Sequence, residues 1–196
     1  MMEDWKRVLD RIVADPRYKT GILYGKPRQG HQEGTVLNHI QQLEHNLKAL
    51  KRFLTNDEYW KLLILIHVHD TFKFQAKRGS PIEDPQSHAS LARAFLKEFT
   101  DNWDLLQMIQ WHDESFVMHR QMETKGGKYN KERFYHRIIE GIMDLNLFLF
   151  FTIIDGFTPS KMHDVHRIRW FVGECRDSNR QPYLDRVYQA LQELHI

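Results

Sequence analysis

The stretch from Leu62 to Lys73 constrains the fold more than any other part of the sequence. Seven residues of almost continuous apolar character lead into His69, Asp70 and Lys73. A run this dense is typical of a buried helix, and its apolar side chains alone explain the burial. The carboxylate needs a further explanation, because an unpaired buried charge costs several kcal/mol or takes up a proton. A cationic partner or a metal ion is the usual remedy, so His69 and Asp70 are candidate metal ligands.

Apolar residues recur at three- and four-residue spacing along most of the chain, and the sequence contains no alternating pattern typical of strands. The pattern predicts helices at about 5–13, 36–50, 57–70, 87–99, 102–112 and 130–155, then one around 165–171 and one at 182–194. We expect loops at 16–34, 71–86 and 114–129, and the first of these is long enough to cover a site. The sequence therefore predicts an all-α fold, and its 196 residues indicate a single domain, 1–196.

Composition and charge exclude several classes of protein. The 28 Lys and Arg residues nearly balance the 26 Asp and Glu residues, which argues against extended nucleic-acid binding. The longest apolar stretch, Leu145–Ile154, is far shorter than the ~20 residues of a membrane-spanning helix, so we expect no membrane association. The N-terminus lacks the pattern of a signal peptide. The single cysteine, Cys175, cannot form an intramolecular disulfide, and this favours a reducing cytoplasmic location.

Helical periodicity separates some inward-facing histidines from those on polar faces. His39 falls within the apolar stripe of its helix, whereas His45 falls on the polar face of the same helix. His112 and Asp155 also lie within apolar stripes, and His88 stands in the first turn of a helix. The predicted set of inward-facing polar residues is therefore His39, His69, Asp70, His88, His112 and Asp155.

This set has the chemistry of a transition-metal site. Imidazole and carboxylate groups suit divalent Mn, Fe, Co, Ni or Zn, and the absence of cysteine from the set argues against a structural zinc site. We expect one or two ions between the central helices. A divalent ion lowers the pKa of a bound water toward neutrality and so supplies a hydroxide.

The order of these residues resembles the HD-domain superfamily of metal-dependent phosphohydrolases, which is named for its His-Asp doublet and has the order H…HD…D. Here the doublet is His69-Asp70, preceded by His39 and followed by Asp155, and Lys73 matches the frequent HD-x-x-K form. The resemblance covers about residues 35–156. It implies an HD-domain-like helical bundle with that core, on which the N-terminal and C-terminal helices pack.

The resemblance also implies roles for individual residues. The first ion would be bound by His39, His69, Asp70 and Asp155. The additional histidines of two-metal members are matched by His88 and His112, and Asp70 would then bridge two ions. Asp70 and Lys73 would be the catalytic residues, with Lys73 also close to the substrate phosphate.

Three functions remain open at this point. The first is a phosphohydrolase that acts on a phosphate monoester or diester of a nucleotide or a related small molecule. The second is an HD-fold di-iron oxygenase, which would require all six ligands. The third is a non-catalytic module that binds a nucleotide or RNA. Lys77 and Arg78, together with Lys26 and Arg28, are candidate substrate-binding residues because their loops could meet an anionic ligand. The sequence leaves the oligomeric state open, a homodimer included.

Overall fold

The computed structural model describes residues 3–28, 32–178 and 184–195, and no β-strand occurs among them. The prediction of an all-α fold is confirmed. The main helices are α1 (Trp5–Ala14), α2 (Pro16–Gly21), α3 (Val36–Leu50), α4 (Asn56–Val68), α5 (His88–Lys97), α6 (Trp103–Trp111), α7 (Glu114–Thr124), α8 (Lys131–Phe134), α9 (Leu145–Gly156), α10 (Val165–Asp177) and α11 (Asp185–Glu193). Short 3-10 helices occur at η1 (Lys51–Phe53) and η3 (Pro159–Asp164), and a π-helical turn occurs at η2 (Tyr135–Ile139).

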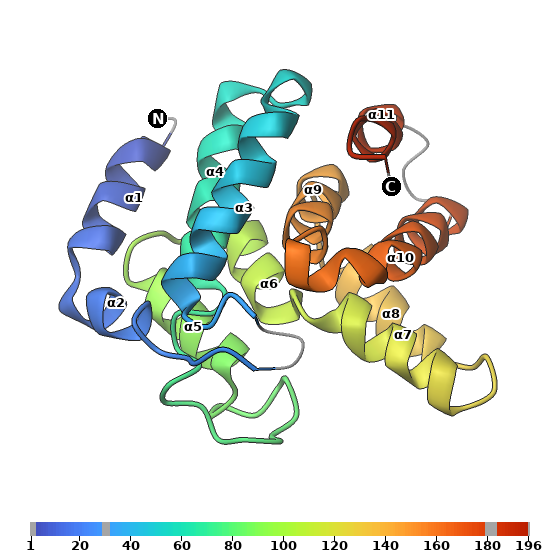
Figure 1. Cartoon of the computed structure of the whole chain (residues 1–196), viewed down its shortest axis with the longest axis horizontal. Helices are drawn as coiled ribbons and strands as arrows, with labels where there is room; N and C mark the ends of the chain where they lie inside the picture. Colours follow the sequence, from blue (N-terminus) through green and yellow to red (C-terminus); the bar gives the residue numbers. More distant parts are fainter. Residues whose placement is uncertain (1–2, 29–31, 179–183, 196) are drawn as a thin grey trace.

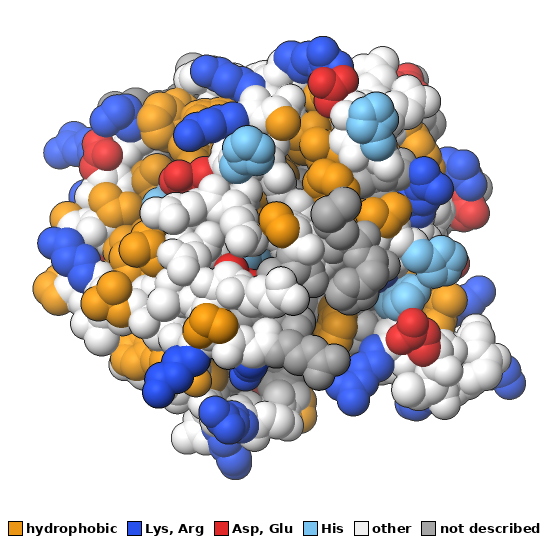
Figure 2. All heavy atoms as spheres, viewed as in Figure 1, with side chains coloured by type: hydrophobic (Ala, Val, Ile, Leu, Met, Phe, Trp, Pro, Cys, Tyr) orange, Lys and Arg blue, Asp and Glu red, His pale blue; other side chains and the backbone are white. Residues whose placement is uncertain are grey.

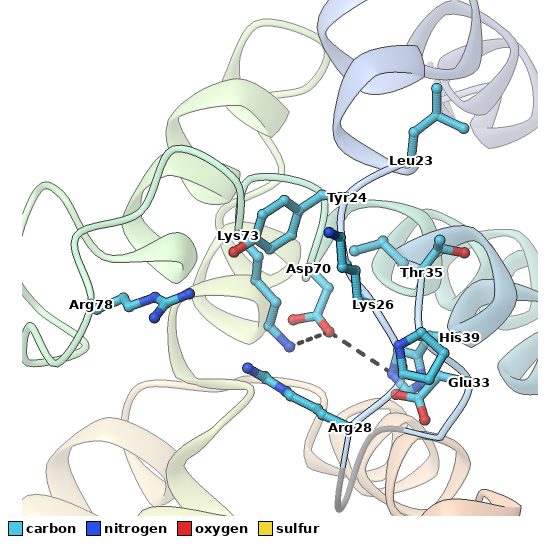
Figure 3. Close-up of a pocket in the computed structure, with 14 residues that line it drawn as sticks. Leu23, Tyr24, Lys26, Arg28, Glu33, Thr35, His39, Asp70, Lys73 and Arg78 are labelled. Atoms are coloured by element: carbon cyan, nitrogen blue, oxygen red, sulfur yellow. Dashed lines mark hydrogen bonds and ion pairs between the residues drawn. The ribbon is translucent and has the colours of Figure 1, made fainter.

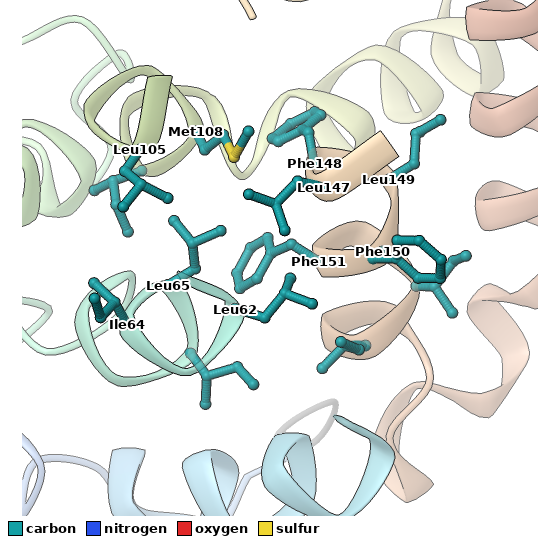
Figure 4. Packing of buried hydrophobic residues seen from close by; sticks show 14 of the residues in the cluster. Leu62, Ile64, Leu65, Leu105, Met108, Leu147, Phe148, Leu149, Phe150 and Phe151 are labelled. Carbon is teal, nitrogen blue, oxygen red and sulfur yellow. The ribbon is translucent and has the colours of Figure 1, made fainter. Parts of the chain in front are cut away.

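Two helices, α4 and α9, form the centre of the molecule (Figure 1). Helix α4 packs against α1, α3, α6 and α9, and α9 in turn packs against α3, α10 and α11. Figure 4 shows Leu62 and Leu65 of α4 facing Leu147 and Phe151 of α9. Each such buried side chain contributes about 1.5–3 kcal/mol relative to exposure. Burial on every side explains why neither helix has a marked polar face.

Side-chain caps fix where most of the helices begin. Thr55 and Glu58 form the capping box expected from their spacing, with each side chain accepting the other's backbone N–H. Other N-caps accept an N–H from the first turn in the same way, and these are Asp4, Asp15, Thr35, Ser87, Asn102, Asn130 and Asp144. The predicted starts of α3, α4, α5 and α6 lie within one residue of the observed ones.

The prediction of one long loop over 16–34 is wrong at its beginning, where α2 forms. Asp15 caps this helix and Pro16 occupies its first turn, an arrangement that favours helix initiation. Gly21 lies so close to the chain after α4 that an added Cβ would be 2.1 Å from the Thr71 carbonyl oxygen. Helix α2 therefore packs directly against the segment that carries Asp70.

The predicted loop over 114–129 is also wrong, because residues 114–124 form α7. The buried side of α7 includes Glu114 and Ser115, so an apolar stripe does not reveal it in the sequence. Glu114 is fully buried, and it accepts hydrogen bonds from Arg133 and Arg137. The helix ends before Gly126-Gly127, where both residues have positive φ.

The single long helix predicted from 130 to 155 is interrupted between η2 and α9. Asp104 of α6 accepts the backbone N–H groups of Met143 and Asp144 at 2.7 and 2.9 Å. Asp144 then caps α9 by accepting the Leu147 N–H. These carboxylates accept backbone N–H groups that would bond within the helix if it were continuous. The break cannot be recognised in the sequence because the residues on both sides of it are apolar.

The C-terminal helices follow the prediction in outline. Helix α10 packs on α7 and α9, and α11 packs on α9. Arg186 of α11 forms an ion pair with Glu58 of α4 at 2.8 Å, which ties the end of the chain to the central helix. The predicted start of the last helix at Pro182 lies outside the described residues.

Charged side chains of both signs lie mainly around the edge of the face drawn in Figure 2, between apolar ones. Within the described part of the chain, no helix has both the length and the apolar character needed to cross a membrane.

Candidate metal centre

The site is built where α4 ends. His69 is the C-cap residue of α4, and Asp70 lies in the turn that follows. Both side chains are buried, as the apolar run before them predicts. Three other helices bring their polar residues to this turn: α3 carries His39, α5 begins with His88, and α9 carries Asp155 near its end. His112, the C-cap residue of α6, completes the set.

The first candidate ligand group consists of His39, His69 and Asp70, whose ligand atoms all lie within 4.8 Å of one another. His69 Nε2 is 3.4 Å from Asp70 Oδ2, and His39 Nε2 is 4.0 Å from the same oxygen. Asp155 Oδ1 lies 3.0 Å from His39 Nε2 and 3.8 Å from His69 Nε2. Two ligands of one ion at about 2.1 Å are about 3.0–3.4 Å apart in octahedral or tetrahedral geometry, so this spacing is close to that of a coordination shell.

The second candidate group consists of Asp70, His88 and His112, again within 4.8 Å. His88 Nε2 and His112 Nε2 are 3.1 Å apart, and each is 3.9 Å from Asp70 Oδ1. Asp70 thus presents Oδ2 to the first group and Oδ1 to the second. Asp113 adds a further carboxylate, with Oδ2 3.2 Å from His88 Nε2.

Backbone contacts orient two of the imidazoles as ligands. His69 Nδ1 lies 3.2 Å from the Leu65 carbonyl oxygen and 3.1 Å from that of Ile66, and His112 Nδ1 lies 2.7 Å from the Ile109 carbonyl oxygen. Since a carbonyl only accepts, each Nδ1 carries a proton and each Nε2 points into the site, where its lone pair can bind an ion once Nε2 is deprotonated. His69 Nε2 is buried and makes no well-formed hydrogen bond with any described atom. A cation at this point would give that lone pair a partner, so the residues present fit a metal ion.

The two central carboxylates remain ionised in spite of their burial. Burial alone would raise their pKa, but for Asp70 the charges of Lys73 and His69 outweigh it. The charge of Lys161 and the contact with His39 do the same for Asp155, and both carboxyl pKa values lie well below the usual range. Lys73 Nζ donates to Asp70 Oδ2 at 2.5 Å, and Lys161 Nζ lies 3.2 Å from Asp155 Oδ1.

The imidazoles differ in their preferred charge. Burial lowers the pKa of His39, and it lowers the pKa of His112 to about 4, so both are neutral near pH 7. Burial also disfavours the charged form of His69, but the negative charges of Asp70 and Asp155 outweigh it and raise its pKa. The site therefore attracts positive charge at His69, and a metal ion can supply it in place of a proton.

A buried cluster of His39, His69, Asp70, His88 and His112, with His88 at its more open side, could therefore hold a metal ion. The ligand types are those of divalent transition metals.

Two cavities open beside the cluster. The first has a volume of about 560 Å³, and His39, Asp70 and Lys73 form part of its lining. The second, of about 410 Å³, reaches His88. Among the residues that the sequence suggested for substrate binding, Arg28, Lys73 and Arg78 line both cavities, Lys26 lines the first, and Lys77 lines the second. Residues 23–28 and 33–36 form much of the first wall, so the segment after α2 does cover the site, as predicted.

Sequence reasoning missed Lys161, which contacts Asp155 from η3. No periodic pattern marks that short segment, and only its position shortly after Asp155 could have suggested the contact. His67, two residues before the doublet, faces away from the cluster. Its Nδ1 lies 2.6 Å from the Tyr18 hydroxyl and its Nε2 lies 3.0 Å from Glu44 Oε1, so it links α2, α3 and α4.

Comparison with known proteins adds no family assignment: no family model matches the chain, and no curated protein or solved structure matches it.

Proposed function

We propose that this protein is a metal-dependent phosphohydrolase of the HD-domain type, which cleaves a phosphate monoester or diester of a nucleotide or a related small molecule. The observation that carries the proposal is the position of Asp70. It lies between two candidate ligand groups and beside a cavity lined by Lys73 and Arg78. Imidazole and carboxylate groups next to cationic walls suit a bound cation and an anionic substrate together.

Each of the candidate ligands, and Lys73, would have its own role. His39, His69, Asp70 and Asp155 would hold one divalent ion, and His88 and His112 would hold a second together with Asp70. Ions held there would lower the pKa of a water molecule toward neutrality and polarise a phosphoryl oxygen. Lys73 would keep Asp70 ionised and oriented through its hydrogen bond, and its charge would favour the developing negative charge on the phosphate.

A di-iron oxygenase is the second candidate. The observation that favours it is that His88 and His112 both approach the oxygen of Asp70 that the first group does not use, so all six required ligands surround one point. The cationic lining of both cavities favours the hydrolase instead, because an uncharged substrate would leave those charges without a partner. Iron content and oxygen-dependent turnover separate the two functions.

The proposal is tested by hydrolysis of p-nitrophenyl phosphate and bis-p-nitrophenyl phosphate after reconstitution of the metal-free protein with Mn²⁺, Fe²⁺, Co²⁺, Ni²⁺ or Zn²⁺. We expect turnover that requires metal and falls at least about a thousandfold in Asp70→Ala, because that change removes a ligand of both ions. His45→Ala, on the exposed face of α3, is the control and should keep full activity. Absence of hydrolysis with every metal, or unchanged hydrolysis in Asp70→Ala, would contradict the proposal. Binding without turnover would indicate a non-catalytic module.

A further inference from the structure

The two cavities beside the metal centre are parts of one cationic recess. They share four lining residues: Tyr24, Arg28, Lys73 and Arg78. Figure 3 shows Arg28 and Arg78 extending from opposite sides toward Lys73, and all three side chains line the space beside Asp70. Arg28 comes from the segment after α2, and Arg78 from the loop between α4 and α5. In Figure 2, Lys and Arg side chains gather at the lower edge of the molecule, where that loop lies in Figure 1.

Positive charge exceeds negative charge in this recess. The second cavity is lined by Arg28, Lys73, Lys77 and Arg78, with no acidic residue among its lining residues. In the first cavity the acidic lining residues are Asp70, which belongs to the metal centre, and Glu33. Within the described part of the chain, no ion pair joins Arg28, Lys77 or Arg78 to a carboxylate. Three or four like charges around one space repel one another, and a bound anion relieves this repulsion.

The recess contains more cationic groups than a single phosphoryl group at the candidate metal centre would contact. The reacting group would lie at Asp70 and Lys73. Arg28 and Arg78 remain, and guanidinium groups bind phosphate oxygens through paired N–H donors. A phosphoryl group with three oxygens matches two converging guanidinium groups better than a carboxylate with two.

We propose that Arg28 and Arg78 form a subsite for a second phosphoryl group, so that the substrate carries two, as a nucleoside diphosphate or a bisphosphate does. This inference rests on the proposed function and narrows its substrate class. The first cavity also has an apolar wall of Leu23, Pro27 and Val36, which suits the organic part of such a substrate. Tyr24 lines both cavities, and its backbone is held at the site because its carbonyl accepts the Val36 N–H at 2.9 Å.

The test compares methylphosphonate with methylenediphosphonate, which has two phosphoryl groups that resist hydrolysis. Both are titrated calorimetrically against Mn²⁺-loaded protein at one fixed concentration of free Mn²⁺. We expect the diphosphonate to bind wild type at least about tenfold more tightly than the phosphonate, a difference of about 1.4 kcal/mol. In the double variant Arg28→Ala/Arg78→Ala, most of this difference in affinity between the two ligands should disappear. The affinity for methylphosphonate should stay within about threefold of wild type, because the candidate metal ligands are unchanged.

Arg28→Lys/Arg78→Lys should retain part of the ratio, since lysine keeps the charge and lacks the paired donors. Arg120→Ala/Lys125→Ala removes two exposed cations on and just after α7, outside both cavities, and should leave the ratio unchanged. An equal ratio in wild type and Arg28→Ala/Arg78→Ala would overturn the subsite and leave the hydrolase proposal standing. Failure of wild type to bind either ligand would overturn both.

Discussion

At the scale of single residues, two lysines and two carboxylates contribute most of the charge of the candidate metal centre. Lys73 pairs with Asp70, and Lys161 pairs with Asp155. A buried carboxylate left without a cation is costly, so these lysines stabilise the protein before any metal binds. A metal ion would neutralise the same oxygens. The lysines and the ion would therefore partly replace one another in neutralising the charge of Asp70 and Asp155.

This overlap gives a prediction for Lys161. In Lys161→Ala, the metal-free protein should unfold at a lower temperature, and the increase in melting temperature on adding Mn²⁺ should be larger than in wild type. The reason is that Asp155 loses its cation in the free state and the ion then contributes more to stability. Thermal unfolding with and without Mn²⁺ measures both values.

The control for this experiment is Lys61→Ala, which breaks a similar pair with Asp57 at 2.7 Å that lies outside the candidate ligand groups. It should lower both melting temperatures equally. The role given to Lys161 is wrong if its removal leaves the effect of Mn²⁺ unchanged or smaller.

At the scale of elements, the site depends on how closely α2 approaches the turn after α4. Gly21 makes this approach possible, because a side chain there would collide with the backbone of Thr71. Thr71 follows Asp70 directly, so a displacement of its backbone would also move a ligand shared by both candidate groups.

We predict that Gly21→Ala destabilises the protein by more than about 1 kcal/mol and weakens Mn²⁺ binding, although alanine is the better helix former. Urea unfolding and Mn²⁺ titration measure the two effects. Gly173→Ala is the matched control in the middle of α10, where an added Cβ meets no atom within 4 Å. That change should be neutral or stabilise by about 0.5–1 kcal/mol. Equal behaviour of the two variants would refute the close approach of α2.

The sequence predicted those elements whose apolar stripe or cap is local. The helices predicted to begin at about residues 36 and 57 begin within one residue of those positions, and the continuous run before His69 marked the central helix. Prediction from the sequence was wrong where polar contacts between distant residues determine the structure. Helix α7 buries Glu114 against arginines about 20 residues later, and the break before α9 depends on Asp104, which lies about 40 residues earlier. No local pattern reports such contacts.

At the scale of the whole molecule, five segments distant in sequence bring imidazoles and carboxylates to one place between the central helices. The inward faces and the order of the residues were enough to name the six candidate ligands from the sequence. Their distances, the shared position of Asp70 and the cationic recess needed the fold, because each depends on how the helices cross. The cytoplasmic location and the membership of the HD-domain superfamily stay predictions.

Metal binding by these side chains at two positions joined by Asp70 can be measured by equilibrium dialysis of the metal-free protein against Mn²⁺, followed by elemental analysis. We expect two ions per chain in wild type, one in His88→Ala/His112→Ala, and none in Asp70→Ala. Equal metal content in all three proteins, or no bound metal in wild type, would contradict this expectation.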